Sequence, residues 1–164
     1  MSSDFDTQTV IERAGPSRID VVRVLFHEYE QSVDAPGCFE GFEHELDSLP
    51  GGYCPPVGAL FLALRNTAPV GCVGIRPRDS LTAEVKRLFV REPCRRTGIG
   101  ASLMGAVITH AWQADISELV LETLPTMRAA IGLYQQLGFV PAPAYHHPTA
   151  PGAELLMKRL GAHK

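Results

Sequence analysis

The chain has 164 residues, of which 45% are hydrophobic and 20% charged, and its formal net charge is −3. This is an ordinary globular composition, and the length suits one domain with its own core. The longest apolar run, VGALFLAL at 57–64, is far shorter than the ~18 residues that a membrane span needs. The N-terminus also lacks the basic and apolar stretches of a signal peptide, so we expect a cytoplasmic protein that enters no membrane.

The N-terminal third predicts two helices, because its apolar residues recur every three or four positions. Residues 1–17 precede them and are expected to be flexible or to form an edge strand. A Pro- and Gly-rich stretch at 49–56 then ends the second helix. The two apolar sets are Ile19, Val22, Phe26 and Tyr29, and then Phe39, Phe42, Leu46 and Leu49.

The middle of the chain predicts three strands and a helix. Residues 58–66 and 69–77 read as a hairpin with a tight turn, and residues 83–91 as a third strand. A helix follows over 101–113. Its expected apolar face consists of Met104, Val107, Ile108, Ala111 and Trp112.

The C-terminal part continues this alternation. A strand is predicted at 118–124, and Thr126 is the expected N-cap of a helix that ends at Gly138. Residues 152–160 predict a closing strand. Strand, helix and strand between 83 and 124 form a βαβ unit, so the chain is expected to be a mixed α/β domain.

The stretch REPCRRTGIGASLMG at 91–105 places two arginines and two glycines directly before a predicted helix. A helix N-terminus carries unpaired N–H groups, and glycines let a phosphate approach the backbone closely. The alternative is a turn whose glycines only allow tight packing, which leaves the arginines unexplained. A Walker loop is excluded because no lysine follows either glycine, and a dinucleotide loop because Leu103 stands at the third glycine position.

Other site classes find little support in the sequence. Four cysteines are spread without metal-ligand spacing, and His146 and His147 are adjacent, so we expect no metal and reduced thiols. The basic residues form one short cluster without interleaved aromatic residues, which argues against nucleic-acid binding. The cysteines are Cys38, Cys54, Cys72 and Cys94.

The charges are distributed unevenly. Residues 1–50 hold 11 Asp and Glu against 3 Arg, whereas residues 51–164 hold 7 against 12 Lys and Arg. One interpretation is a set of solvated acidic helices and a basic surface loop. The other is an acidic wall that favours a cationic or neutral acceptor over an anionic one.

Three motifs together resemble the GNAT superfamily of N-acetyltransferases. The sequence RRTGIG is similar to the family's coenzyme A loop, with Arg95, Gly98 and Gly100 at the matching positions. EVKRLFV at 84–90 resembles the family's fourth strand, and LYQQLGF at 133–139 its penultimate helix. The resemblance runs from about residue 58 to the C-terminus. It implies one domain over 1–164 with a mixed central sheet, flanking helices and an N-terminal helical pair.

The resemblance implies an acetyl-CoA-dependent enzyme that acetylates the primary amine of a small molecule or peptide, as a monomer or homodimer. No cysteine matches a nucleophile, so direct transfer in a ternary complex is expected. Met127 stands where relatives often carry an asparagine that contacts the cofactor. A non-catalytic acyl-CoA sensor is the alternative. The expected cofactor-binding residues are Leu88, Phe89, Val90, Arg95, Arg96, Thr97, Gly98, Ile99, Gly100, Ala101 and Ser102.

Two residues are expected to carry the chemistry. Strand alternation places Glu84, Lys86, Leu88 and Val90 on one face, so Glu84 can act as general base if the acetyl group lies near Leu88. The alternative is an ion pair between Glu84 and a neighbouring cation, Lys86 or Arg87. Tyr134 is the expected general acid for the departing thiolate, with core packing as its alternative role. The N–H of Leu88 or Phe89 is expected to stabilise the oxyanion.

Overall fold

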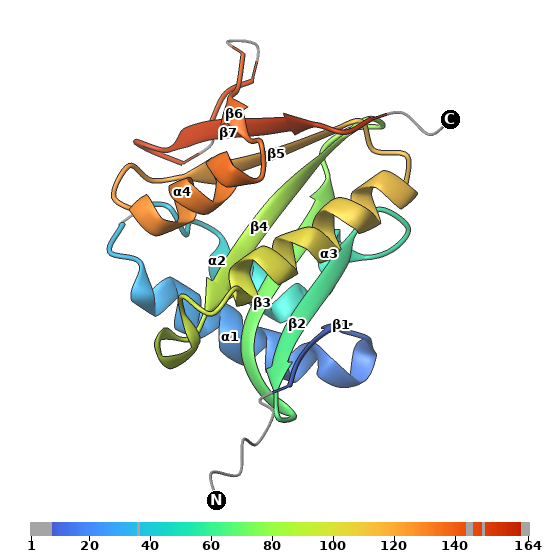
Figure 1. The fold of residues 1–164 in the computed structure, drawn as a ribbon, viewed down its shortest axis with the longest axis vertical. Helices are drawn as coiled ribbons and strands as arrows, with labels where there is room; N and C mark the ends of the chain where they lie inside the picture. Colours follow the sequence, from blue (N-terminus) through green and yellow to red (C-terminus); the bar gives the residue numbers. More distant parts are fainter. Residues whose placement is uncertain (1–7, 36, 144–145, 149, 162–164) are drawn as a thin grey trace, which may run out of the picture.

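The computed structural model describes residues 8–35, 37–143, 146–148 and 150–161. In this part of the chain one seven-stranded sheet has the order β1-β2-β3-β4-β5-β7-β6 (Figure 1). Neighbouring strands run antiparallel except β4 and β5, which are parallel. The strands are β1 (Thr9–Arg13), β2 (Ala59–Arg65), β3 (Ala68–Pro77), β4 (Thr82–Val90), β5 (Glu118–Thr123), β6 (Val140–Pro141) and β7 (Glu154–Arg159).

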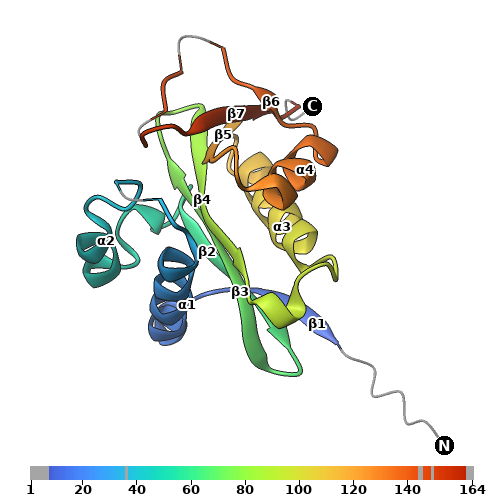
Figure 2. The same cartoon turned by 90° about the vertical axis from the view of Figure 1, so that its left-hand side faces the viewer.

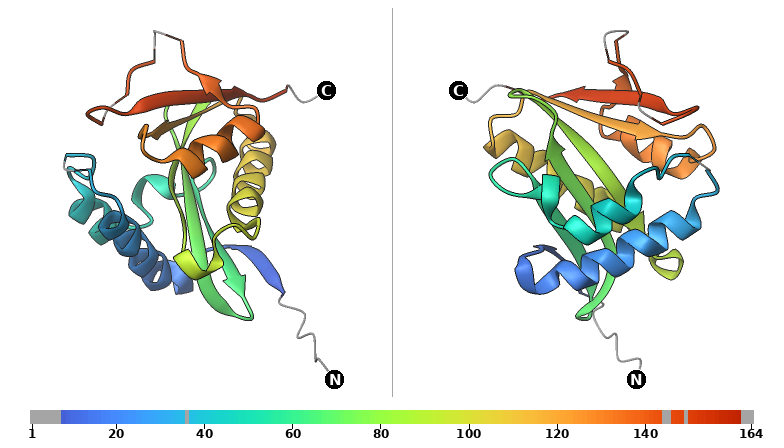
Figure 3. Two further views of the ribbon diagram at one scale, coloured as in Figure 1. Left: turned by 60° about the vertical axis from the view of Figure 1, so that its left-hand side comes forward. Right: turned by 180° about the vertical axis from the view of Figure 1, so that it is seen from behind.

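Helices cover both faces of the sheet, which makes three layers. The α1 and α2 helices lie on one face, and α3 and α4 lie on the other (Figures 2 and 3). Each side has its own apolar core, centred on Phe26 and Leu62 under α1 and on Leu103 and Ile75 under α3. The helices are α1 (Ile19–Ser32), α2 (Phe42–Ser48), α3 (Ile99–Gln113) and α4 (Arg128–Gln136).

The structure confirms the mixed α/β class and most of the expected elements. The hairpin closes through Asn66 and Thr67, which both have positive φ, of 49° and 70°. The edge strand among residues 1–17 is β1, and Gly138 follows α4 with a φ of 89°. The short strand β6 was not predicted, because two residues carry no periodic signal.

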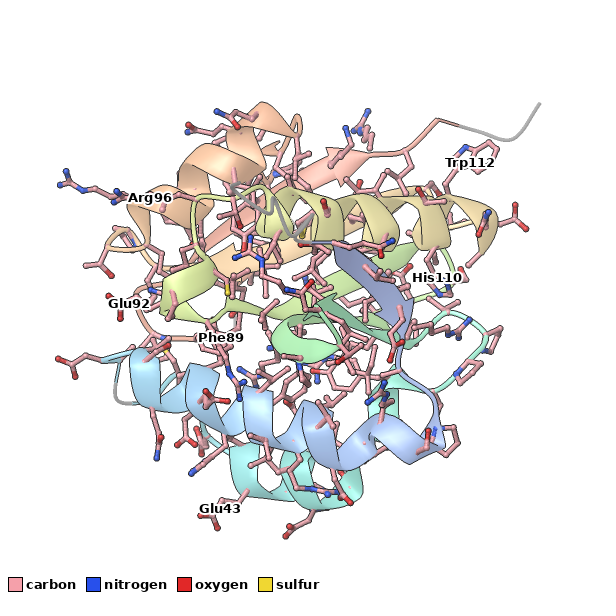
Figure 4. The ribbon with its side chains drawn as sticks, turned by 60° about the horizontal axis from the view of Figure 1, so that its bottom comes forward. Glu43, Phe89, Glu92, Arg96, His110 and Trp112 are labelled. Carbon is pink, nitrogen blue, oxygen red and sulfur yellow. The ribbon has the colours of Figure 1, made fainter. Side chains whose placement is uncertain are left out.

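Two details of the expected helices are wrong. Met127, not Thr126, is the N-cap of α4, and no side chain caps that helix end. Trp112 is 42% exposed instead of lying on the core face of α3, and Figure 4 shows it pointing away from the sheet. The residues that α3 buries most deeply are Leu103, Met104, Val107 and Ala111, which follow helical spacing without Trp112.

The parallel strands β4 and β5 diverge along their length. Their pairing runs from Thr82 opposite Glu118 to Val85 opposite Leu121. Beyond Val85, no residue of β4 pairs with a described residue of β5. Main-chain groups on the open side of β4 are therefore available to other partners.

A β-bulge interrupts β4 at the start of this opening. Gly74 of β3 lies opposite Lys86 and Cys72 lies opposite Phe89, so two residues of β4 face one of β3. Arg87 lies in the bulge with a φ of 61°. A bulge shifts the alternation by one residue, so side chains on either side of it exchange faces. The functional residues of β4 are therefore distributed over both faces of the sheet.

Candidate active site

The opening between β4 and β5 forms a small cleft, which we call the strand cleft. Its walls include Leu88 of β4, Leu124 after β5 and Tyr134 of α4. Tyr29 and Phe39, from the other face of the sheet, also line it. The strand cleft therefore passes through the sheet from the α4 side to the α2 side.

Tyr134 enters the strand cleft from α4. Its side chain packs against Phe139 with the ring centroids 5.9 Å apart, and the residue is 7% exposed. Burial, and to a smaller extent the nearby Tyr29, raises the pKa of its hydroxyl well above the ordinary value of 10. The hydroxyl consequently stays protonated at neutral pH and can donate a proton inside the cleft. Both expected roles, packing and proton donation, are compatible with this position.

The loop before α3 has the geometry of an anion-binding helix start. Gly98 is the N-cap with a φ of 84°, and its carbonyl accepts the first helical hydrogen bond, from the N–H of Ser102 at 3.0 Å. The N–H groups of Ile99, Gly100 and Ala101 thus have no acceptor within the helix. A Cβ atom added at Gly98 would meet no heavy atom within 4 Å, so the space in front of the loop is open.

The two arginines of this loop take different positions. The Nε atom of Arg95 donates to the carbonyl of Val90 at 2.8 Å, and its guanidinium lies 5.8 Å from the centroid of the Phe89 ring. Arg95 thereby joins the loop to the end of β4. Arg96 is exposed and extends outward from the loop (Figure 4). Positive charge therefore lies both beside the helix start and in front of it.

Glu84 does not lie on the same face as Leu88, as alternation predicted. Glu84 and Lys86 face α2, whereas Leu88 and Val90 pack with the α3 core, because the bulge at Arg87 shifts the alternation. The Glu84 side chain is only 6% exposed. It faces Lys86 at 3.3 Å, Arg76 at 3.4 Å and Arg78 at 3.9 Å, so the ion pair with Lys86 is present, and Arg76 and Arg78 take the place of the expected Arg87.

A larger pocket of about 570 Å³ opens on the α2 side of the sheet, and we call it the α2 pocket. Its lining includes Arg76, Lys86, Arg87, Glu45 and Tyr53.

The α2 pocket and the strand cleft share part of their lining, and so they meet. The shared residues are Cys38, Lys86, Arg87, Glu122 and Ala150. Sequence reasoning assigned no role at the site to Cys38 or Glu122, and it considered Arg87 only as an ion-pair partner of Glu84. The sequence does contain one sign that Glu122 is unusual, because it is a charged residue that directly follows the apolar run LVL in β5.

Several acidic residues in the N-terminal half already have basic partners, and two of them pair with β4 or its end. Glu28 of α1 accepts three hydrogen bonds from Arg91, at 3.0, 3.2 and 2.6 Å. Glu45 of α2 accepts two from Arg87, at 2.9 and 3.2 Å. These carboxylates attach the N-terminal helices to β4 and its end, so their charges are largely compensated.

The described residues contain no helix long and apolar enough to cross a membrane. In the same part of the chain, no three His, Cys, Asp or Glu side chains gather in a way that could hold a metal ion.

The diverging strands and the open helix start define a class of transferases that use an acyl-coenzyme A. The sequence pattern of the acetyltransferase (GNAT) family matches residues 23–139, and the chain belongs to this family. It is an N-acetyltransferase, and acetyl-CoA is the cofactor of the family.

Known proteins resemble the chain over most of its length. An uncharacterised N-acetyltransferase from Schizosaccharomyces pombe is 30% identical over 138 residues, which cover 83% of this chain and 85% of that protein. A GNAT acetyltransferase structure from Staphylococcus aureus Mu50 has a TM-score of 0.74 at 20% identity, covering 94% of this chain and 100% of that one. A GNAT acetyltransferase structure from Elizabethkingia anophelis with acetyl-CoA bound has a TM-score of 0.62 at 24% identity. The match covers 93% of this chain and 98% of that one.

Proposed function

We propose that the protein transfers an acetyl group from acetyl-CoA directly to a primary amine while both molecules are bound. The main support for this proposal is the strand cleft, which joins the α4 side of the sheet to the α2 pocket. A donor entering from the α3 and α4 side and an acceptor in the α2 pocket would meet there. Holding both reactants in one geometry removes the entropy cost of a bimolecular encounter.

The residues at the helix start fit the diphosphate of acetyl-CoA. Unpaired N–H groups at residues 99–101, the open space at Gly98 and the nearby arginines all favour an anion. The unpaired side of β4 at Leu88, Phe89 and Val90 offers main-chain groups to the amide-containing arm. We assign the diphosphate contacts to residues 95–102.

When bound, acetyl-CoA supplies the acetyl group as a thioester. An N–H of Leu88 or Phe89 would hold the acetyl carbonyl oxygen, as in other sites that stabilise an oxyanion. The hydroxyl of Tyr134 would give its proton at the sulfur as the carbon–sulfur bond breaks and the carbon–nitrogen bond forms. Burial keeps that hydroxyl protonated at neutral pH, as a proton donor must be, while the raised pKa also makes it a weaker acid.

Glu84 is the base that the sequence suggests, and in this fold it would act through water. Its carboxylate is buried among Arg76, Arg78 and Lys86, and it lines neither the strand cleft nor the α2 pocket. A water molecule or a second carboxylate must therefore stand between Glu84 and an amine in the pocket.

A thiol-release assay with pooled amines tests the enzyme against the sensor alternative. We expect coenzyme A to appear only when an accepted amine is present. If acetyl-CoA binds by calorimetry while no pool releases thiol, the protein is a sensor. Intact-mass measurement after incubation with acetyl-CoA alone tests direct transfer, because an acetyl adduct on Cys38 would contradict it.

A further inference from the structure

We propose that the acceptor carries a carboxylate as well as its amine, as a free amino acid does. In this proposal Arg76 and Lys86 hold the carboxylate, and Glu122 receives the ammonium group and its proton. The proposal rests on the function proposed above and names the class of acceptor for the same site.

The β3 and β4 side of the α2 pocket has more positive than negative side chains. Four cations and two carboxylates meet there, and each cation has a nitrogen within 4 Å of a carboxylate oxygen. Arg87 is matched by Glu45 in a two-point pair. Glu84 is shared among the remaining three cations, Arg76, Arg78 and Lys86. On this side of the pocket the positive side chains therefore outnumber the described carboxylates by two, and Glu40 and Glu122 on the other walls balance them. Separated charges of this kind suit a ligand that carries both an anionic and a cationic group.

Arg76 and Lys86 are placed to use this surplus charge. Both line the α2 pocket, and the Arg76 side chain is 38% exposed. Its distances to Glu84 and Glu45 are 3.4 and 3.8 Å, longer than a strong charge-assisted hydrogen bond. A carboxylate in the pocket could therefore take up guanidinium donors that Glu84 and Glu45 satisfy only weakly.

Glu122 lies on β5, across the opening from β4, where the pocket joins the strand cleft. The register places Val120 beside Glu84, and both face the α2 side. Glu122 is two residues further along β5 and has the same facing, just past Leu121, where pairing with β4 ends. It lines both cavities, whereas Glu40 and Glu45 line only the α2 pocket.

This arrangement gives the amine a direct proton acceptor. An ammonium group beside Glu122 gives one proton to a carboxylate oxygen, which passes it to solvent. The nitrogen keeps the electron pair with which it bonds to the acetyl carbon in the strand cleft. As the carbon–sulfur bond breaks, the nitrogen loses its second proton, which replaces the one that Tyr134 gives to the sulfur. Glu84 then acts as a positioning residue that holds Arg76 and Lys86 in place.

A free amino acid carries one positive and one negative charge, so the inferred acceptor stays within the cationic or neutral class expected from the acidic N-terminal half, but it adds a carboxylate. That expectation counted carboxylates along the chain. Glu28 and Glu45 face arginines instead of a free ligand. The β3 and β4 wall of the pocket is positive, whereas Glu122 and the exposed Glu40 line the rest of it.

A paired substrate panel tests the acceptor class. Each free amino acid is assayed beside its carboxamide, which keeps the amine and removes the negative charge. We expect the best amino acid to exceed its carboxamide at least about tenfold in kcat/KM, because the neutral analogue offers Arg76 and Lys86 no negative charge. Equal rates for the acid and the amide, or turnover of amines without any amino acid being accepted, would overturn the proposal.

Substitutions in the α2 pocket test which residues bind the carboxylate and which bind the amine of the acceptor. Arg76→Gln should raise KM for the amino acid and leave KM for the carboxamide unchanged, and Arg76→Lys should restore part of the loss. Arg159→Gln removes a positive charge from β7 of the same sheet and serves as the matched control. A similar rise in KM for both substrates in Arg76→Gln would contradict carboxylate binding.

Glu122→Gln should lower kcat/KM about 100-fold for both members of the pair, with unchanged affinity for acetyl-CoA. Glu84→Gln should act mainly on KM for the amino acid. Full activity of Glu122→Gln would overturn its role.

Acetyl-CoA calorimetry on every variant shows whether the variant is folded, and on the parent protein it separates the two proposals. Failure to bind acetyl-CoA in the parent protein contradicts the proposed function, whereas binding without carboxylate preference contradicts only this inference.

Discussion

Arg87 and Glu45 join strand β4 to helix α2 through two hydrogen bonds of 2.9 and 3.2 Å. The guanidinium also lies over the rings of Phe39 and Phe42, 5.1 and 4.8 Å from their centroids. Burial lowers the pKa of Arg87, but the hydrogen bonds and charge of Glu45 outweigh that effect and raise it. The bulge in β4 and the wall of the α2 pocket are thereby fixed by one ion pair.

Breaking this pair should destabilise the fold. Glu45→Gln leaves the Arg87 charge without a counterion at a site where the two side chains are 10% and 16% exposed. We expect a loss of about 2–3 kcal/mol in the free energy of unfolding, measured by urea denaturation. Asp20→Asn, which breaks a solvent-exposed pair with Arg23, should change nothing measurable. Equal stability of Glu45→Gln and the parent would show that the pair contributes nothing net.

Replacing Gly98 should weaken acetyl-CoA binding. The residue has a φ of 84°, which costs a side-chain-bearing residue roughly 1–2 kcal/mol, so Gly98→Val should shift the loop. The valine methyl groups would also fill the space in front of the helix start. We expect at least a tenfold rise in Kd, about 1.4 kcal/mol, by calorimetry. Gly105→Val, in the same helix and also next to open space, is the control. Unchanged affinity in Gly98→Val would refute the assignment of the diphosphate to this loop.

Removing the hydroxyl of Tyr134 should slow turnover and leave binding intact. Tyr134→Phe keeps the ring that packs against Phe139, so the melting temperature and the Kd for acetyl-CoA should not change. General acid catalysis typically contributes ~10²–10⁴-fold, so kcat should fall at least about tenfold. A variant with full kcat would mean that Tyr134 only packs.

The pH dependence of the same pair of proteins tests the protonation state of Tyr134. Burial raises the pKa of this hydroxyl above 10, so the protonated form persists below that raised value and is lost only above it. The ratio of parent kcat to Tyr134→Phe kcat should therefore stay constant from about pH 7 to pH 10. A ratio that declines within this window would show that the hydroxyl ionises at an ordinary or lowered pKa.

Tyr53 carries a buried hydroxyl without a hydrogen-bond partner in the described part of the chain. The residue is 3% exposed and packs edge-on against Phe26. Tyr53→Phe removes the unsatisfied group and keeps the ring, so it should stabilise the fold by about 1 kcal/mol in urea denaturation. Tyr29→Phe should give no such gain, because Tyr29 is only partly buried and lines the strand cleft. A loss of stability in Tyr53→Phe would reveal a partner for its hydroxyl.

The sequence by itself determined the features that depend on neighbours along the chain. Helical spacing located α1, and alternating and apolar runs located β2 to β5, because side chains a few residues apart decide which face of an element is buried. The glycines at 98 and 100 located the start of α3 for the same local reason.

Tertiary structure decided which residues meet at the site. Alternation placed Glu84 on the side of Leu88, but the bulge at Arg87 separated them, and a bulge depends on the pairing of β4 with β3. The partners of Glu28 and Glu45 lie 63 and 42 residues away, so counting acidic residues could not show that they were compensated. Glu122 joins the site only because β4 and β5 stop pairing at Leu121. Local periodicity carries no information about contacts between distant segments, and packing of the helices on the twisted sheet sets those contacts.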